Sequence, residues 1–490
     1  MAVLPIELRR SGAEAIVFNT PRHRAPLAVD PSAAPGNTPV DSVTPLIARW
    51  RSPIHREMLG PIAIIGCLTL VVKVLGILRE VLIARSYGVG DRVDAYLAAL
   101  TPLTLATGLI GALNAAFIPT FIRVRENHGL ERAHDLLQHV AWRGMLVLIC
   151  ATAVLGASGH AILTITAPGF SAAKLALAFR LYLIMLPVLF FTGASTLWTA
   201  VLNADARFAV GALAPAALSA TVVGALVIFR DDPNAFVLAA ATTFGYAFQA
   251  VVLLSALRRR DIPATPWARG SSEHMRDVMQ QFAPILAGSL LLTSTLFLDQ
   301  ALASLLPAGS VATLGYGNRI ATQLSSLLML AVGSAALPVF SRMVAANDWL
   351  NVRRRLIQYS LIVFVMAAVP SVVLFLGSDQ LVKLVYQRGA FSAADTRMVA
   401  QVQRMFLVQV PFLATSILFV RVISAMRLNQ FLLVGNVVTV VMNGLLDYVL
   451  MRRMGVAGIA LATSVVYIAM FGLLSLAVFH SISRAAATSG

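Results

Sequence analysis

The chain has 490 residues, of which 58% are hydrophobic and 12% are charged, and its mean hydropathy is +0.80. Soluble domains carry roughly 25% charged residues, so this composition excludes an ordinary soluble enzyme or binding domain and predicts a polytopic membrane protein. The net charge of +16 fits cytoplasmic loops rich in Lys and Arg, which leaves nucleic acid as a poor candidate partner. We find no sequence pattern for a catalytic site, a metal site or a bound cofactor.

Residues 1–58 differ from the rest of the chain. They combine prolines with arginines and show no hydrophobic periodicity, which is typical of a disordered segment. They also lack the apolar core of a secretory signal. Arg49, Arg51 and Arg56 directly precede the first apolar run and predict that it starts from the cytoplasm. We therefore expect a disordered, basic, cytoplasmic extension.

The remainder is a series of apolar runs, each near the roughly 20 residues that a helix needs to cross a bilayer. Arginine-rich loops follow the second, sixth and eighth runs, on the side of the N-terminus, as expected for cytoplasmic loops. An even number of spans places both termini in the cytoplasm. The twelve runs are residues 61–86, 95–121, 138–158, 175–202, 209–229, 235–257, 280–306, 311–340, 356–377, 399–425, 431–450 and 456–479.

An internal repeat divides these spans into two sets of six. At an offset of 219 residues Pro119 matches Pro338, and Gly90 matches Gly309 in the preceding turn. Six spans per half make the repeats parallel, related by an axis along the membrane normal. The prediction is an all-α polytopic membrane protein whose two six-helix bundles surround a central cavity, with alternating access between them.

The repeat also sets the predicted domain boundaries. The N-terminal bundle covers residues 59–258 and the C-terminal bundle covers residues 280–480. A cytoplasmic linker, residues 259–279, joins them, and a cytoplasmic tail, residues 481–490, follows.

Three charged residues lie inside the first span: Lys73, Arg79 and Glu80. A charge at the centre of a bilayer costs about 2.5–3.5 kcal/mol on insertion scales, so such residues face a polar interior. Arg319 begins a related polar segment in the second half. One interpretation is a cationic lining for an anionic ligand, and the other is a structural ion network between helices.

An acidic residue inside a membrane span is likewise open to a functional and a structural interpretation. Asp299, within the seventh span, is a candidate for pairing with a cation across the cavity or for binding a coupling ion, and a structural pair explains it equally well. Arginine forks suit phosphate best among anions. Because no nucleotide-binding loop is present, energy would come from an ion gradient, the membrane potential or the gradient of the substrate itself.

Several segments resemble the MurJ (MviN) lipid II flippases, which belong to the multidrug/oligosaccharidyl-lipid/polysaccharide exporter superfamily. They are residues 74–80, 84–88, 111–119, 315–319 and 384–391. The resemblance implies a transporter of the bacterial inner membrane and not an enzyme. Such a protein moves an undecaprenyl-pyrophosphate-linked glycan precursor to the periplasmic leaflet, as a monomer in contact with membrane lipid and with glycan-assembly proteins as further partners.

The resemblance also assigns roles to residues. Arg79 and Arg319 match cavity arginines of the family, and Lys73 matches a third such position with its charge but without the planar fork. Asp94 matches the acidic residue after the first turn and, with Glu80, is a candidate for ion coupling or a structural pair.

The chain departs from the family pattern in two places. The run 103–106 lacks a fourth cavity arginine, and the family's thirteenth and fourteenth spans have no counterpart here. These departures leave lipid II or a related exopolysaccharide precursor as substrates. A multidrug or cation antiporter that uses Glu80, Asp299 and Asp447, and a non-transporting scaffold of a glycan-assembly complex, are the alternatives.

Overall fold

In the computed structural model, the described residues are 53–204, 207–259, 275–426, 428 and 430–489. The chain divides into two compact units, residues 1–59 and 60–490. Most of the predicted extension 1–58 and residues 260–274 of the predicted linker lie outside the described residues. Every regular element of the described chain is a helix, which confirms the predicted all-α class.

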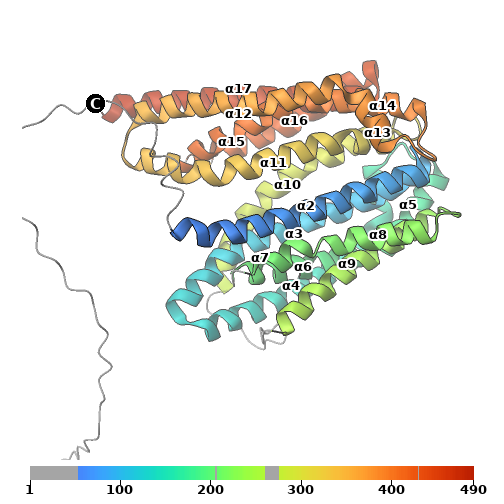
Figure 1. The fold of residues 1–490 in the computed structure, drawn as a ribbon, viewed down its shortest axis with the longest axis horizontal. Coiled ribbons are helices and arrows are strands. Elements are labelled where there is room, and N and C mark those ends of the chain that lie inside the picture. Colours follow the sequence, from blue (N-terminus) through green and yellow to red (C-terminus); the bar gives the residue numbers. More distant parts are fainter. Residues whose placement is uncertain (1–52, 205–206, 260–274, 427, 429, 490) are drawn as a thin grey trace, which may run out of the picture. The chain divides into compact units, whose positions relative to one another are not determined.

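The first half of the chain supplies six spans, two of which are interrupted. In Figure 1 they form the lower group of helices, coloured blue to green. The helices are α2 (Pro53–Tyr87), α3 (Asp91–His128), α4 (Leu130–Thr166), the pair α5 (Ala172–Met185) and α6 (Pro187–Ala204), the pair α7 (Phe208–Leu213) and α8 (Ala216–Ile228), and α9 (Ala235–Arg258).

The second half repeats this order and adds one short helix, α13. Except for α10, which crosses behind α2 and α3, its helices form the upper group in Figure 1, coloured yellow to red. They are α10 (Met275–Ser304), α11 (Ser310–Ala345), α12 (Trp349–Leu376), α13 (Ser378–Tyr386), the pair α14 (Ala393–Leu407) and α15 (Val410–Ala425), α16 (Gln430–Met454) and α17 (Val456–Ser489).

The repeat predicted from the sequence is visible in these helices. Gly90 and Gly309 directly precede α3 and α11, and Pro119 and Pro338 lie inside them. The fourth span of each half is broken at a comparable point, where α6 begins at Pro187 and α15 has a proline in its first turn. Proline has no N–H to donate to the preceding turn, so it favours the start of a helix over its interior.

The length and polarity of the helices agree with a membrane protein. Within the described residues, eight helical segments are long and apolar enough to cross a bilayer. With α2, α3, α10 and α11 they complete the two sets of six. Large apolar side chains point outward along several of these helices, for example Val147, Val373 and Leu445, each more than 60% exposed. Such exposure is expected where lipid is the solvent.

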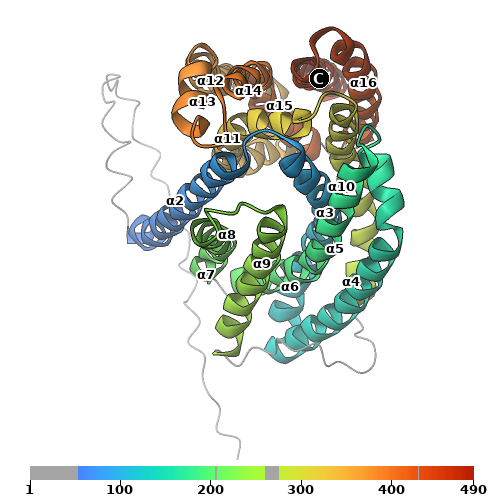
Figure 2. The same ribbon diagram turned by 90° about the vertical axis from the view of Figure 1, so that its right-hand side faces the viewer.

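The two halves meet through α2 and α3 on one side and α10, α11 and α13 on the other (Figure 2). One buried cluster draws on both halves and contains Ala84, Val93, Tyr316 and Phe391. The backbones come very close nearby, since the N–H of Ala390 donates to the carbonyl of Arg85 at 2.8 Å. These contacts fix the polar faces of α2 and α11 opposite each other.

Candidate functional site

Glu80 joins the two halves by binding one arginine from each. Its carboxylate lies 2.8 Å from the Arg79 guanidinium on the same helix and 3.1 Å from that of Arg319 on α11. The Glu80 side chain is 13% exposed, against 22% for Arg79 and 43% for Arg319. Two guanidinium cations share one carboxylate, so the group keeps a net positive charge.

Lys73 adds a third cation on the same side of α2. Its ammonium donates to Gln323 and, at 3.2 Å, to the hydroxyl of Ser326, both on α11. Lys73 and Glu80 are seven residues apart, which is about 10 Å along a helix, so they meet α11 at successive levels. The structure therefore brings all three predicted cationic residues to the contact between α2 and α11.

Two cavities flank Arg319. One, of about 200 Å³, has Arg79, Glu80 and Arg319 in its wall, together with Tyr96 and Tyr246. The other, of about 260 Å³, is lined by Arg319 and by polar side chains of α10 and α11. The Nε atom of Arg79 is buried and donates to no acceptor within the described chain. The site thus offers cationic donors that an anionic ligand could occupy.

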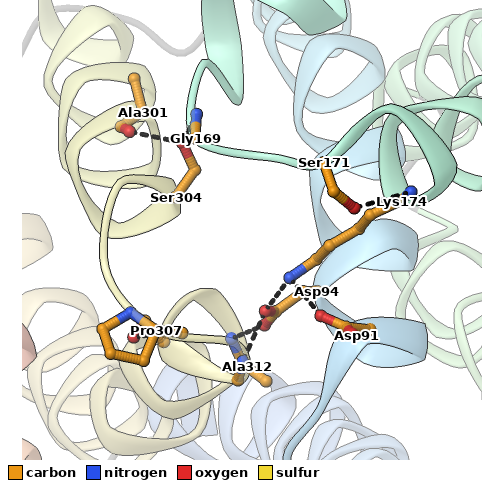
Figure 3. Close-up of polar contacts among 11 residues, drawn as sticks. Asp91, Asp94, Gly169, Ser171, Lys174, Ala301, Ser304, Pro307 and Ala312 are labelled. Atoms are coloured by element: carbon orange, nitrogen blue, oxygen red, sulfur yellow. Dashed lines mark hydrogen bonds and ion pairs between the residues drawn. The ribbon is translucent and has the colours of Figure 1, made fainter.

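Asp94, in the first turn of α3, connects the two halves where α2 ends and α3 begins. Its carboxylate is 1% exposed and accepts from the backbone N–H groups of Gly309 and Ala312, both at 2.7 Å. Lys174, on α5, lies 2.6 Å from the same carboxylate and 2.7 Å from that of Asp91 (Figure 3). An anion at a helix N-terminus is stabilised by the free N–H groups and by the helix dipole. Asp94 therefore ties the first half to the start of α11.

Asp299 lies in a separate polar cluster inside the second half. Its carboxylate accepts from the Asn443 amide at 2.6 Å and from the Thr463 hydroxyl at 3.4 Å. The same amide donates to Asp447 at 2.6 Å, and both carboxylates are buried. The structure does not bring Asp299 to the arginines on Glu80, although Asp299 and Arg319 both line the 260 Å³ cavity.

The sequence profile of the family described as lipid II flippase MurJ matches residues 83–484. The chain belongs to the MurJ family. It is therefore a multi-pass transporter and not an enzyme, as the resemblance of its motifs predicted.

Named relatives agree with this assignment. A probable lipid II flippase MurJ of Synechocystis is 26% identical over 83% of this chain and 79% of the relative. One from Rhizobium tropici is 29% identical over 71% of this chain and 67% of the relative. The lipid II flippase MurJ of Burkholderia cenocepacia is 28% identical over 68% of this chain and 66% of the relative.

Solved structures support the fold. The lipid II flippase MurJ in an inward closed conformation matches with a TM-score of 0.72 at 21% identity, over 87% of this chain and 90% of that one. An inward-facing multidrug transporter of the MATE family matches with a TM-score of 0.73 at 13% identity, over 87% and 99%. At these identities the likeness concerns the fold alone, which both members of the superfamily share.

Sequence reasoning missed several partners of the predicted residues. Gln323 and Ser326 hold Lys73, and Lys174 neutralises Asp94, yet none of the three stood out in the sequence. A signal for the first two was available, because Arg319, Gln323 and Ser326 recur at helical spacing on one face of α11. Lys174 gave no such signal, since it lies 80 residues from Asp94.

Proposed function

We propose that this chain moves an undecaprenyl-pyrophosphate-linked glycan precursor, lipid II or a related exopolysaccharide precursor, from the cytoplasmic to the periplasmic leaflet of the bacterial inner membrane. The observation that carries the proposal is the pair of arginines, Arg79 and Arg319, which come from opposite halves and share Glu80 beside a cavity. Each planar guanidinium can bind a phosphate oxygen pair in a bidentate manner. A ligand held by both halves is one that their relative motion can transfer.

Glu80 would act as an internal stand-in for the ligand. It occupies the two guanidinium groups while the cavity holds no anion, which reduces the cost of their charge at membrane depth. An incoming pyrophosphate carries more negative charge than one carboxylate and competes for the same donors. Lys73 would contribute a point charge without the fork geometry of arginine.

The Asp94 contact would close the periplasmic side. The turn between α2 and α3 lies on that side if the N-terminus is cytoplasmic, as the arginines before the first span favour. Opening toward the periplasm would require Asp94 to leave the N–H groups of Gly309 and Ala312. Alternating access then becomes the exchange of this contact for new ones at the opposite end.

Energy for the exchange would come from a cation that binds near Asp299. The two carboxylates of Asp299 and Asp447 share the Asn443 amide in a buried setting. Two adjacent carboxylates inside a membrane protein favour uptake of a cation or a proton. This cluster is also the feature that a related antiporter would use, so a dependence on ion gradients is common to both functions.

The test is leaflet transfer of a fluorescent lipid-linked pyrophosphate glycan by the full chain in vesicles. We expect Arg79→Ala and Arg319→Ala each to lower the transfer rate by about 100-fold, since each removes a charge-assisted contact worth roughly 1.5–3 kcal/mol and leaves Glu80 with one partner. Arg230→Ala is the matched control, because Arg230 is 77% exposed in a loop beside Asp231. Normal transfer by both cavity variants, at normal protein levels, would refute the proposal.

A further inference from the structure

A large apolar cavity lies in the first half, away from the arginines on Glu80. It measures about 830 Å³, near the upper end of the roughly 300–1,000 Å³ typical of ligand pockets. Leu68 of α2, side chains of α7 and α8, and one face of α9 line it, and the polar side chains in its described wall are Ser255 and Arg259.

The cavity is long as well as large. Along α9 and its C-cap residue the lining runs from Phe248 to Arg259, which is eleven steps along the helix or about 17 Å. Arg259, the C-cap residue of α9, is exposed and lines one end of the cavity. An apolar channel with a cationic end matches an amphiphile that has one apolar chain and an anionic head.

Neither water nor empty space suits this cavity. Water needs polar partners, which the described part of the wall offers at one end alone. A void of this size would forfeit the dispersion contacts of its whole lining. Within a bilayer a lipid chain fills the space without a penalty. Because lipid tails are as apolar as leucine, selection among chains depends on packing and on the charge at the end of the cavity.

The large cavity shares helices with the smaller cavity that holds the arginines. Three elements contribute to both this cavity and the smaller one that holds the arginines: α2 through Leu68 and Arg79, α8 through Ala220 and Leu218, and α9 through Phe248 and Tyr246. When the phosphate of a bound lipid lies at Arg259, the helices that separate it from the cationic cavity are therefore the same helices that line both cavities.

We propose that this cavity is a loading site that binds the isoprenoid chain of the substrate, with its phosphate at Arg259. The inference rests on the proposed function for the identity of the lipid. In this proposal the isoprenoid chain lies in the N-terminal half, between α2, α8 and α9. Arg259 contacts the phosphate before the phosphate moves to Arg79 and Arg319.

The experiment uses the full chain in vesicles and an undecaprenyl phosphate with a photoreactive group in its chain. We expect crosslinks on α8 and α9. Ala220→Phe fills the cavity from an exposed position, and we expect it to lower labelling about tenfold, the effect of displacing roughly two methylenes' worth of contact. Ala153→Phe, at an exposed position of α4, is the matched control.

The charge at the end of the cavity is tested in the same assay. Arg259→Gln should lower labelling about threefold, the scale of one exposed ion pair. Arg258→Gln, which removes a neighbouring charge outside the lining, should leave labelling unchanged. Equal labelling of wild type and Ala220→Phe would overturn the proposal, as would loss of labelling when phosphatidylglycerol is added in excess, since the cavity would then bind anionic lipid in general.

Labelling and leaflet transfer separate this proposal from the proposed function. If Ala220→Phe loses labelling while Arg79→Ala and Arg319→Ala transfer normally, the isoprenoid site is supported and the proposed role of the arginines is wrong. If the arginine variants lose transfer while Ala220→Phe is labelled like wild type, the role of the arginines is supported and the isoprenoid site is wrong.

Discussion

Replacing Asp94 by Asn should open the junction at the start of α11. The native carboxylate accepts two backbone N–H groups at 2.7 Å and one ammonium at 2.6 Å, with 1% of the residue exposed. An Asn side chain has one oxygen and presents its NH₂ group to the remaining donors. It therefore loses the charge that Lys174 requires and at least one hydrogen bond to α11.

The size of the effect follows from these contacts. Hydrogen bonds to a charged group are worth roughly 1.5–3 kcal/mol each, and removing one partner of a buried ion pair costs about 3–5 kcal/mol. Because Lys174 keeps its pair with Asp91, we expect the lower part of this range, about 2–3 kcal/mol. That shifts the equilibrium between closed and open forms by roughly 30- to 150-fold toward the open form.

Pulsed electron paramagnetic resonance can measure this shift. Spin labels are placed at positions 230 and 388, which are exposed and lie near the Pro233 carbonyl that accepts from Arg92 and the Ala390 N–H that donates to Arg85. In this background Cys67 and Cys150, both exposed, are replaced by Ser. We expect a longer distance component to dominate in Asp94→Asn. Asp91→Asn is the control, because Asp91 is 61% exposed and contacts Lys174 but not α11. An unchanged distance distribution in Asp94→Asn would refute the argument.

Two further substitutions test the charges inside the membrane. Glu80→Gln leaves two guanidinium groups without a counterion, so we expect a lower melting temperature without ligand and a larger stabilisation by inorganic pyrophosphate than in wild type, both measured by thermal unfolding. Equal stabilisation of both proteins would contradict the view of Glu80 as a stand-in anion. Asp299→Asn should lower transfer driven by an imposed sodium or proton gradient about tenfold, against Asp231→Asn, which is 89% exposed, as the control. Full gradient dependence in Asp299→Asn would remove the proposed coupling role.

Much of this architecture could be predicted because the bilayer restricts it. Each span could be predicted from the length of its apolar run. The matching positions of Gly90 with Gly309 and of Pro119 with Pro338 predicted the repeat. The interruptions of both fourth spans and of the fifth span were missed, since residues 175–202, 399–425 and 209–229 were each predicted as one helix. Pro187 and Pro411 could have revealed the breaks in the fourth spans, because proline rarely lies inside a helix.

The site was harder to predict than the fold. Charges at membrane depth are rare, so Lys73, Arg79, Glu80 and Arg319 stood out. Their pairing depends on the rotation and height of α2 against α11, which no local pattern determines. Neutral partners such as Gln323 carry no comparable signal, since interhelical amides are common in membrane proteins. The Asp299 cluster needs three helices to come together, and the sequence indicated Asp299 and Asp447 as separate candidates without their shared contact with Asn443.

The two halves contribute different numbers of charged residues to the site, and this affects which contacts a relative motion of the halves can break. Arg79 and Glu80 lie on the same helix, so their contact survives any rigid motion of one half against the other. Arg319 belongs to the second half, and its contact with Glu80 at 3.1 Å breaks when the halves separate. Arg319 is also the more exposed of the two arginines, at 43% against 22%. Under the proposed function, an anion entering the cavity would meet Arg319 first, and by displacing Glu80 from Arg319 it would remove a contact that holds the halves together. Binding of the ligand and release of the halves would then be linked through one carboxylate.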